Sequence, residues 1–379
     1  MRSRLASSLG GAFLTAGVLL ACGSRTGLFA PDLTSQLIID ASIDVKIDAI
    51  ACVPGQFTFD LALTQLMFVL DRSGSMAFTI DGRRGQPRTQ WRWTLLQNAL
   101  SKTITTFDNQ IAMGAKFFPQ ELASGQASSE EACTTLGSVE IPPARNNADA
   151  ILRVFDTTTP IGGTPTAEAV RIAAQSLVTS RSVARTIVLA TDGAPNCNGD
   201  IDARTCTCTS AQDQQSCNDP RTANGRFNCL DESRAVSVIR DVNENQGIPV
   251  YVIGIGSADR PEFLDVLDDM AVAGGRPQPA SSGRRHFNVQ SGDDLTNALE
   301  SIRDSVSKCT YLTPSAPTDP DAISVRINGV TIPRDETKTD GWDWVNRELG
   351  ALAFFGDACT RAQSASSPQG VSGTVTCGP

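Results

Sequence analysis

Histidine and tyrosine are nearly absent from this 379-residue chain, which holds one His and two Tyr. A Ser-His-Asp triad needs an imidazole beside its nucleophile, and the single histidine, His286, begins an apolar stretch far from the serine-rich turn at Ser73. The chain also lacks a Gly-x-Ser-x-Gly elbow, a phosphate-binding loop and a dinucleotide-binding glycine pattern. These absences argue against an enzyme, and we expect His286 to be structural.

The apolar run near the N-terminus, Leu9 to Ala21, is too short to span a membrane stably. It follows two basic residues, Arg2 and Arg4, which is the layout of a secretion signal. The junction Leu19-Leu-Ala-Cys22 resembles the lipobox of bacterial lipoproteins. An ordinary signal peptide with an incidental cysteine is the alternative. We predict a signal peptide over residues 1–21.

This resemblance implies that Cys22 carries lipid and becomes the mature N-terminus, anchoring the protein to a membrane of the bacterial cell envelope. The residues that follow, Gly23 and Ser24, lack the aspartate retention signal known in some bacteria. We therefore predict an outer-membrane location, on either its periplasmic or its surface-exposed face.

The chain is acidic, and its partners should reflect that. The formal charge is −9, and loss of Arg2 and Arg4 with the signal peptide would make it −11. An acidic body argues against nucleic acid as a partner. If Cys22 is lipidated, ten of the eleven cysteines remain, and an even number in an exported protein indicates disulfides. These candidates are Cys52, Cys133, Cys197, Cys206, Cys208, Cys217, Cys229, Cys309, Cys359 and Cys377.

The mature chain divides by the pattern of its apolar residues. Residues 22–58 show no pattern that could bury a face, so we expect a flexible tether. Residues 59–308 alternate strand-like apolar runs with amphipathic helical stretches, which predicts an α/β fold with a doubly wound, mostly parallel sheet flanked by helices. The expected strands are 66–70, 111–118, 185–191, 249–256 and 286–289, and the expected helices are 89–107, 164–178, 230–245, 261–273 and 293–306.

Residues 309–379 form a different, β-rich segment. Residues 323–327 alternate, Asn328-Gly329 is a favoured two-residue hairpin turn, and residues 330–332 return as the second strand. We expect Cys359 and Cys377 to close this segment. Because some seventy residues of this composition would be marginally stable alone, we expect a small C-terminal β-rich appendage packed on the main domain.

Three short oxygen-bearing side chains, Asp71, Ser73 and Ser75, follow the first predicted strand at alternating positions. Alternate residues of a tight turn can point the same way, and one carboxylate with two hydroxyls suits a small hard cation such as Mg²⁺. In a doubly wound fold such a site belongs at the carboxyl ends of the strands. The turn therefore predicts a divalent-cation site.

This Asp-x-Ser-x-Ser string resembles the metal-ion-dependent adhesion site of the von Willebrand factor type A family. The family's distant threonine and aspartate match Thr164, in Gly-Gly-Thr-Pro-Thr, and Asp192, in Ala-Thr-Asp-Gly, and the resemblance covers roughly residues 65–308. Thr166 is an alternative to Thr164. The resemblance implies Mg²⁺, with Mn²⁺ or Ca²⁺ as alternatives, held by Asp71, Ser73, Ser75, Thr164 and Asp192.

The same resemblance implies a binding function. In this family an acidic residue of a protein partner completes the metal shell, because few protein charges on the ion leave it electrophilic. Arg83, Arg84 and Arg88 follow the motif and either steer such a partner or form a solvated basic loop. The rival interpretations are a structural envelope protein with a silent site and a metal-assisted hydrolase, for which a second base is missing.

A cysteine-rich insertion, residues 196–229, follows Asp192 directly. It has little apolar content, so disulfides must order it, and it should lie on the metal face and shape partner choice. Its five cysteines are an odd number, so one needs an outside partner, for which Cys133 is the candidate; Cys52, Cys309, Cys359 and Cys377 would pair among themselves. Cys206-Thr-Cys208 lacks the spacing of a zinc site, and Asp200, Asp202, Asp213 and Asp219 lack that of a calcium loop.

Overall fold

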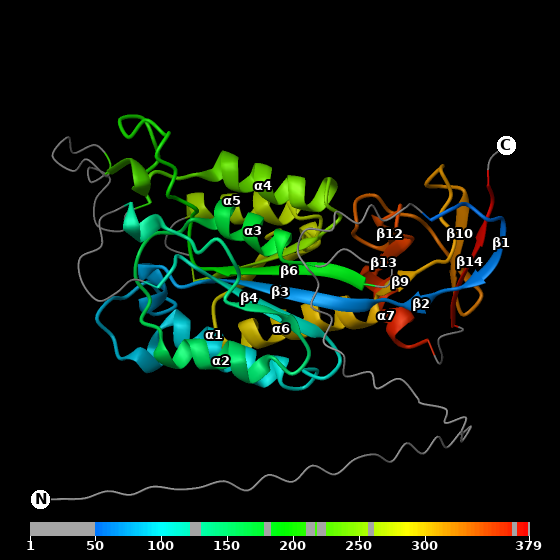
Figure 1. Cartoon of the computed structure of the whole chain (residues 1–379), viewed down its shortest axis with the longest axis horizontal. Coiled ribbons are helices and arrows are strands. Elements are labelled where there is room, and N and C mark those ends of the chain that lie inside the picture. Colours follow the sequence, from blue (N-terminus) through cyan, green and yellow to red (C-terminus); the bar gives the residue numbers. More distant parts are fainter. Residues whose placement is uncertain are drawn as a thin grey trace, which may run out of the picture. The chain divides into compact units, whose positions relative to one another are not determined.

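The apolar run at residues 66–70 lies in the middle of a six-stranded sheet in the computed structural model (Figure 1). The structure describes residues 50–121, 130–177, 183–209, 217, 225–256, 261–365 and 370–377, which all belong to one compact unit. The signal peptide, Cys22, the first part of the tether, Asp213 and Asp219 lie outside these residues. Within them, no helix is both long enough and apolar enough to cross a membrane.

The central sheet confirms the predicted doubly wound fold. Its strand order is β5-β4-β3-β6-β7-β8, and every neighbouring pair is parallel except β4 with β5. The strands are β3 (Leu63–Asp71), β4 (Ala112–Phe118), β5 (Ile141–Ala144), β6 (Val183–Thr191), β7 (Val250–Ile255) and β8 (Phe287–Val289). The edge strand β5 was not predicted, because its sequence Ile-Pro-Pro-Ala is typical of a loop. Its prolines are tolerated at a sheet edge because an edge strand needs fewer N–H donors.

Helices cover both faces of this sheet (Figure 1). Alternate residues of β3 point to opposite faces, so Leu66 and Phe68 join one apolar core while Met67 and Val69 join the other. The first core is covered by α1 (Arg92–Ile104), α2 (Ala148–Thr157) and α6 (Gly292–Lys308), and the second by α3 (Thr166–Gln175), α4 (Glu232–Glu244) and α5 (Pro261–Ala273).

The C-terminal appendage is a sandwich of two antiparallel four-stranded sheets. One has the order β1-β14-β10-β11 and the other β12-β13-β9-β2. Their shared core includes Phe59, Trp342 and Leu352, and a helix, α7 (Gly356–Gln363), packs beside it. The strands are β1 (Gly55–Thr58), β2 (Asp60–Leu61), β9 (Thr310–Leu312), β10 (Ile323–Ile327), β11 (Val330–Ile332), β12 (Gly341–Asn346), β13 (Ala351–Phe355) and β14 (Val371–Val375).

Two predicted boundaries need correction. Residues 55–58, assigned to the tether, form β1 and pair with β14, with Gly55 opposite Val375. Residues 60–61, assigned to the main domain, form β2 and pair with β9. The appendage is therefore built from two distant segments of the chain, and a four-residue strand whose partner comes more than 300 residues later leaves no local pattern to detect.

The disulfides agree with most of the pairing inferred from the sequence. Cys133 bonds to Cys197 of the insertion, as expected. Within the insertion Cys206 bonds to Cys229 and Cys208 to Cys217, while Cys52 bonds to Cys377 and Cys309 to Cys359. The expectation that Cys359 and Cys377 close the appendage is thus correct only in part. Both form disulfides within the appendage, but Cys359 bonds to Cys309 and Cys377 bonds to Cys52.

The appendage joins the main domain at the amino end of β3, away from Asp71. Both chain connections are there, since β2 runs directly into β3 and α6 runs directly into β9. The Ala62 N–H donates to the Thr310 carbonyl at 3.0 Å, and the Thr64 hydroxyl donates to the Val306 carbonyl at 3.3 Å. The carboxyl end of the sheet is therefore left to the loops that carry the predicted metal ligands.

The single histidine is a buried part of the fold. His286 is 1% exposed, and its Nδ1 lies 2.7 Å from Oδ1 of Asp268, which also accepts from the backbone N–H groups of Arg285 and His286. Burial lowers the pKa of His286, and this effect exceeds the opposing influence of Asp268. The imidazole is held in place by these contacts, in agreement with a structural role.

Burial of His286 predicts a pH effect on stability. The unfolded chain takes up a proton near pH 6.5, whereas the folded chain does so only at lower pH, so the free energy of unfolding should fall as the pH drops below about 6.5. The loss should approach about 1.4 kcal/mol per pH unit. Between pH 7.5 and pH 5, urea unfolding should show a greater loss of stability on acidification for the native chain than for His286→Asn, because every other titrating group, including Asp71, is common to both proteins. Equal losses would contradict a neutral buried imidazole.

Candidate metal centre

Parallel pairing of β3 and β6 brings two buried carboxylates to one edge of the sheet. Leu70 lies opposite Ala190, so Asp71, which ends β3, and Asp192, which follows β6, are neighbours. Their residues are 0% and 3% exposed, respectively. The Thr191 hydroxyl donates to Oδ2 of Asp71 at 2.6 Å and orients it. Two residues 121 positions apart thus meet because both strands end at the same edge.

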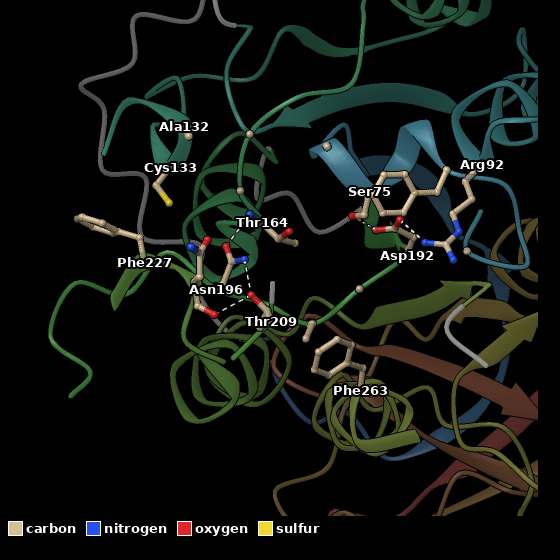
Figure 2. A pocket seen from close by; sticks show the side chains of 18 of the residues that line it. Ser75, Arg92, Ala132, Cys133, Thr164, Asp192, Asn196, Thr209, Phe227 and Phe263 are labelled. Carbon is tan, nitrogen blue, oxygen red and sulfur yellow. Dashed lines mark hydrogen bonds and ion pairs between the residues drawn. The ribbon is translucent and has the colours of Figure 1, made fainter. Parts of the chain in front are cut away.

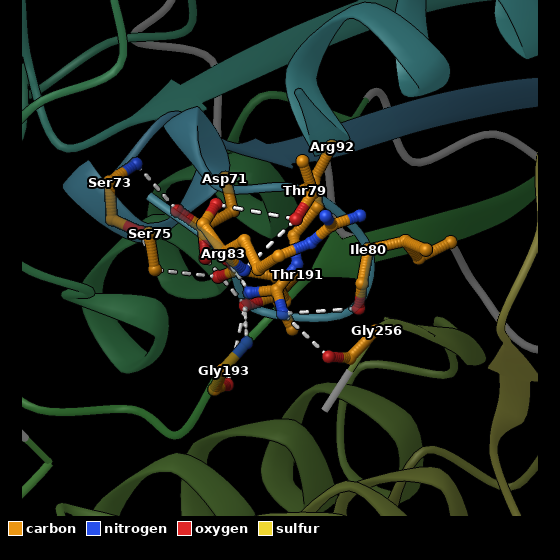
Figure 3. Close-up of polar contacts among 11 residues, drawn as sticks. Asp71, Ser73, Ser75, Thr79, Ile80, Arg83, Arg92, Thr191, Gly193 and Gly256 are labelled. Atoms are coloured by element: carbon orange, nitrogen blue, oxygen red, sulfur yellow. Dashed lines mark hydrogen bonds and ion pairs between the residues drawn. The ribbon is translucent and has the colours of Figure 1, made fainter. Parts of the chain in front are cut away.

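The serines of the motif bridge these two carboxylates (Figure 3). The Ser73 N–H donates to Oδ1 of Asp71 at 2.7 Å, and a short 3₁₀ turn at Gly74–Ala77 follows. The Ser73 and Ser75 hydroxyl oxygens are 3.1 Å apart, and the Ser75 hydroxyl donates to Oδ1 of Asp192 at 2.8 Å. Four of the predicted ligands therefore form one hydrogen-bonded group.

Thr164 comes from a third segment and lines the same cavity as Ser75 and Asp192 (Figure 2). Its N–H donates to Oδ1 of Asn196 at 2.7 Å, and the Asn196 N–H donates back to the Thr164 carbonyl at 3.0 Å. The alternative residue, Thr166, is fully buried, with its hydroxyl 3.5 Å from the Thr164 carbonyl. Of the two threonines, only Thr164 lines the cavity.

The glycines before Thr164 allow the loops to approach closely. A Cβ on Gly163 would lie 2.5 Å from Sγ of Cys197, which real side chains do not tolerate. Gly162 has φ +101°, a left-handed conformation that favours glycine. Its carbonyl accepts from the Gly74 N–H at 3.0 Å, which joins the threonine loop to the serine turn.

Arg92, which sequence analysis did not single out, pairs with Asp192. Its Nη1 donates to Oδ2 of Asp192 at 2.6 Å, and Nη2 donates to the Gly256 carbonyl at 2.6 Å. Both side chains are almost fully buried, at 5% and 0% exposed. The sequence offered little indication of this ion pair, because an arginine in the first turn of an amphipathic helix is ordinarily solvated.

The donor set fits a small hard cation. The site offers two carboxylates and three hydroxyl groups, and Mg²⁺ prefers such oxygen ligands and usually keeps several water molecules. Burial, followed by the nearby charge of Asp192, raises the pKa of Asp71 to about 7, although hydrogen bonds from Thr191 and Ser73 oppose the shift. A divalent cation bound between Asp71 and Asp192 would be attracted to both carboxylates and would offset the repulsion between them.

A cavity of about 380 Å³ opens beside these residues (Figure 2). The cysteine-rich insertion forms part of its wall through Asn196, Thr209 and Phe227, so this insertion lies on the same side of the sheet as the predicted ligands. Phe78 and Phe263 add apolar surface. A cavity of this size, lined by the predicted ligands and by aromatic side chains, can accept a side chain of another molecule.

Buried charges hold the segment that carries Cys133. Lys116 is 0% exposed and donates to the carbonyls of Leu136 and Ser138 at 2.9 and 2.8 Å. Glu140 lies 3.4 Å from both Lys116 and Arg72. Arg72, which lies between Asp71 and Ser73, therefore connects the serine turn to the segment around Glu140. The Cys133–Cys197 disulfide connects that same segment to the insertion.

The three predicted steering arginines have different surroundings. Arg83 pairs with Asp81 at 2.8 Å, and both side chains are more than half exposed, so this ion pair contributes little to the stability of the fold. Arg84 stacks over the Phe78 ring at 4.5 Å and lines the cavity. Arg88 donates to the backbone carbonyls of α2 at Phe155 and Thr158, at 2.6 and 3.0 Å. Of these three arginines, only Arg84 lines the cavity.

The chain is similar to a known protein family and to several solved structures. The von Willebrand factor type A domain model matches residues 65–302, and no curated protein matches. Similar solved structures include the PilB minor pilin from Streptococcus sanguinis, 18% identical with a TM-score of 0.45, covering 65% of this chain and 62% of that one. Others are an aerotolerance-related membrane protein from Bacteroides fragilis (18%, TM-score 0.40, coverage 65% and 99%) and the vWF domain of the pili tip protein Mfa5 from Porphyromonas gingivalis (12%, 0.39, 65% and 95%).

Proposed function

Since the chain belongs to the von Willebrand factor type A family, we propose that it is a lipid-anchored binding protein of the bacterial cell envelope. In this proposal a divalent cation, held directly or through water by Asp71, Ser73, Ser75, Thr164 and Asp192, captures an acidic residue of a protein partner. The observation that carries it is the convergence of these side chains, from three separate segments, on one edge of the sheet.

The charge of the site explains why it would bind a partner and hold it. With both carboxylates ionised, as ligands of a cation would be, Asp71 and Asp192 carry two negative charges, and Arg92 returns one positive charge at 2.6 Å from Asp192. A bound Mg²⁺ would therefore leave the group with a net positive charge, and the ion would supply an open, electrophilic position for an incoming carboxylate. Arg84, on the cavity wall, would add to this attraction.

The cavity favours a partner whose acidic residue is flanked by apolar side chains. Phe78, Phe227 and Phe263 line the same cavity as Ser75 and Asp192. Apolar contact with these rings would supplement the single metal–carboxylate bond. The cysteine-rich insertion, fixed by three disulfides, supports a preformed wall, which reduces the entropy cost of binding.

The membrane assignment rests on the N-terminal sequence. Cys22, after a short apolar run, would carry the lipid, and residues 23–49 would connect it to the folded unit. An outer-membrane anchor would place the metal face within reach of other envelope or surface proteins.

Metal binding is tested by thermal unfolding of the full chain, produced in an oxidising compartment, in chelator and then in Mg²⁺, Mn²⁺ or Ca²⁺. At a hundred times its dissociation constant, an ion that binds only the folded chain stabilises it by about 2.7 kcal/mol. The rise in midpoint should disappear in Asp71→Ala. It should persist in Asp81→Ala, which removes an exposed carboxylate from the next turn. No rise with any of these ions would rule out the proposed metal-dependent capture.

A further inference from the structure

A second cavity, of about 370 Å³, lies between the main domain and the appendage. One wall comes from Tyr251 near the amino end of β7, from α6 and from Arg276 after α5. The other wall comes from Phe355 at the end of β13, from α7 and from the turn that holds Lys338. The proposed metal-dependent function uses none of these residues.

Arg276, on the lining of this cavity, has a guanidinium whose hydrogen-bonding capacity is not satisfied within the described chain. The residue is only 8% exposed, and its Nε and Nη1 are buried without a hydrogen-bond partner among the described residues. The guanidinium packs over the rings of Phe355 and Tyr251, at 4.7 and 5.7 Å. Arginine stays charged in proteins, and a buried charge without hydrogen-bonding partners is costly, so this group lacks an anionic acceptor.

Lys338 supplies a second cation from the opposite wall. It adopts a left-handed conformation, φ +57°, which is unfavourable for a residue with a side chain. The surrounding turn imposes it, because the Asp335 carboxylate accepts from the backbone N–H groups of Thr337, Thr339 and Asp340 at 2.8–2.9 Å. Burial, and then the charge of Arg276, lower the pKa of Lys338, as expected for two cations that face one cavity.

From this arrangement we infer that the cavity binds a tetrahedral oxyanion, a phosphate or sulfate group carried on a small molecule, between Arg276 and Lys338. The planar guanidinium donates in pairs to such oxygens, and the Thr339 and Thr360 side chains also line the cavity. Donors on opposite walls suit a tetrahedral ion, whose oxygens point in several directions, better than a planar carboxylate.

The remaining surroundings are compatible with this ligand. Asp304 is a carboxylate on the lining, but it already pairs with Arg303 at 2.7 Å and Lys308 at 3.3 Å. The cavity exceeds the size of the anion alone, and Phe287 and Phe354 supply apolar wall for an attached organic group. The ligand would bridge the main domain and the appendage.

The inference is tested by calorimetric titration of the full chain with inorganic phosphate, sulfate and acetate, in chelator and chloride at constant ionic strength. We expect phosphate or sulfate to bind more tightly than acetate, and the tighter of the two identifies the group. Arg276→Gln should weaken that binding about tenfold or more, the effect expected for lost hydrogen bonds to a charged group. Lys338→Gly, which suits the left-handed backbone, should also weaken it.

Two variants serve as controls. Lys102→Gln removes one positive charge from an exposed position on α1, and Asp71→Ala changes the metal centre; both should bind the anion as the native chain does. Arg276→Gln removes no hydrogen bond of the described chain, so it should fold. Anion binding that survives in Arg276→Gln, acetate binding as tight as phosphate and sulfate, or no binding of either tetrahedral ion would each overturn the inference.

Discussion

Replacement of Arg92 by methionine is expected to lower the free energy of unfolding of the metal-free protein by about 3–5 kcal/mol. Arg92 and Asp192 are both almost fully buried and are joined at 2.6 Å. Removal of the guanidinium leaves the Asp192 carboxylate without its cation in a site that already contains Asp71. Urea unfolding in chelator measures the loss.

Two further results separate this pair from a general packing effect. Arg92→Met combined with Asp192→Asn should recover part of the loss, because the buried charge is then gone as well. Mg²⁺ should stabilise Arg92→Met more than the native chain, since the ion would meet two carboxylates with no competing cation. A loss below about 1 kcal/mol in Arg92→Met would show that the ion pair contributes little to the fold.

Loss of the Cys52–Cys377 disulfide should have a comparable effect, about 5 kcal/mol. This bond joins residues 325 positions apart and ties the segment before β1 to the segment after β14. A cross-link that closes a long loop restricts the unfolded chain most, so Cys52→Ser with Cys377→Ser releases much of that restriction. Thermal unfolding under oxidising conditions measures the change.

The matched control is the Cys208–Cys217 bond, which spans only nine positions. Cys208→Ser with Cys217→Ser should cost about 3 kcal/mol or less by the same argument. Equal losses for the two disulfides would contradict an effect governed by loop length and would point to local packing at each bond.

The long-range bond also shows why the appendage boundary could not be predicted. Phe57 and Phe59 hint at a strand near the end of the assigned tether, but β1 becomes recognisable only when it pairs with β14. Counting the cysteines divided them into two sets, the insertion cysteines with Cys133 and the four remaining cysteines, within which the disulfides were expected. It could not decide that Cys359 bonds to Cys309 and Cys377 to Cys52, because that depends on which strands lie together.

The sequence alone determined the fold class and the candidate ligands of the metal centre. A strand buried on both faces is a continuous apolar run, a covering helix repeats its apolar residues every three or four positions, and a turn with Asp71, Ser73 and Ser75 carries its oxygens at local spacing. Only the tertiary structure decided the rest. Arg92 pairs with Asp192, and Arg276 and Lys338 line one cavity, because segments far apart in the chain come together, and such neighbours have no period or spacing that a local pattern could reveal.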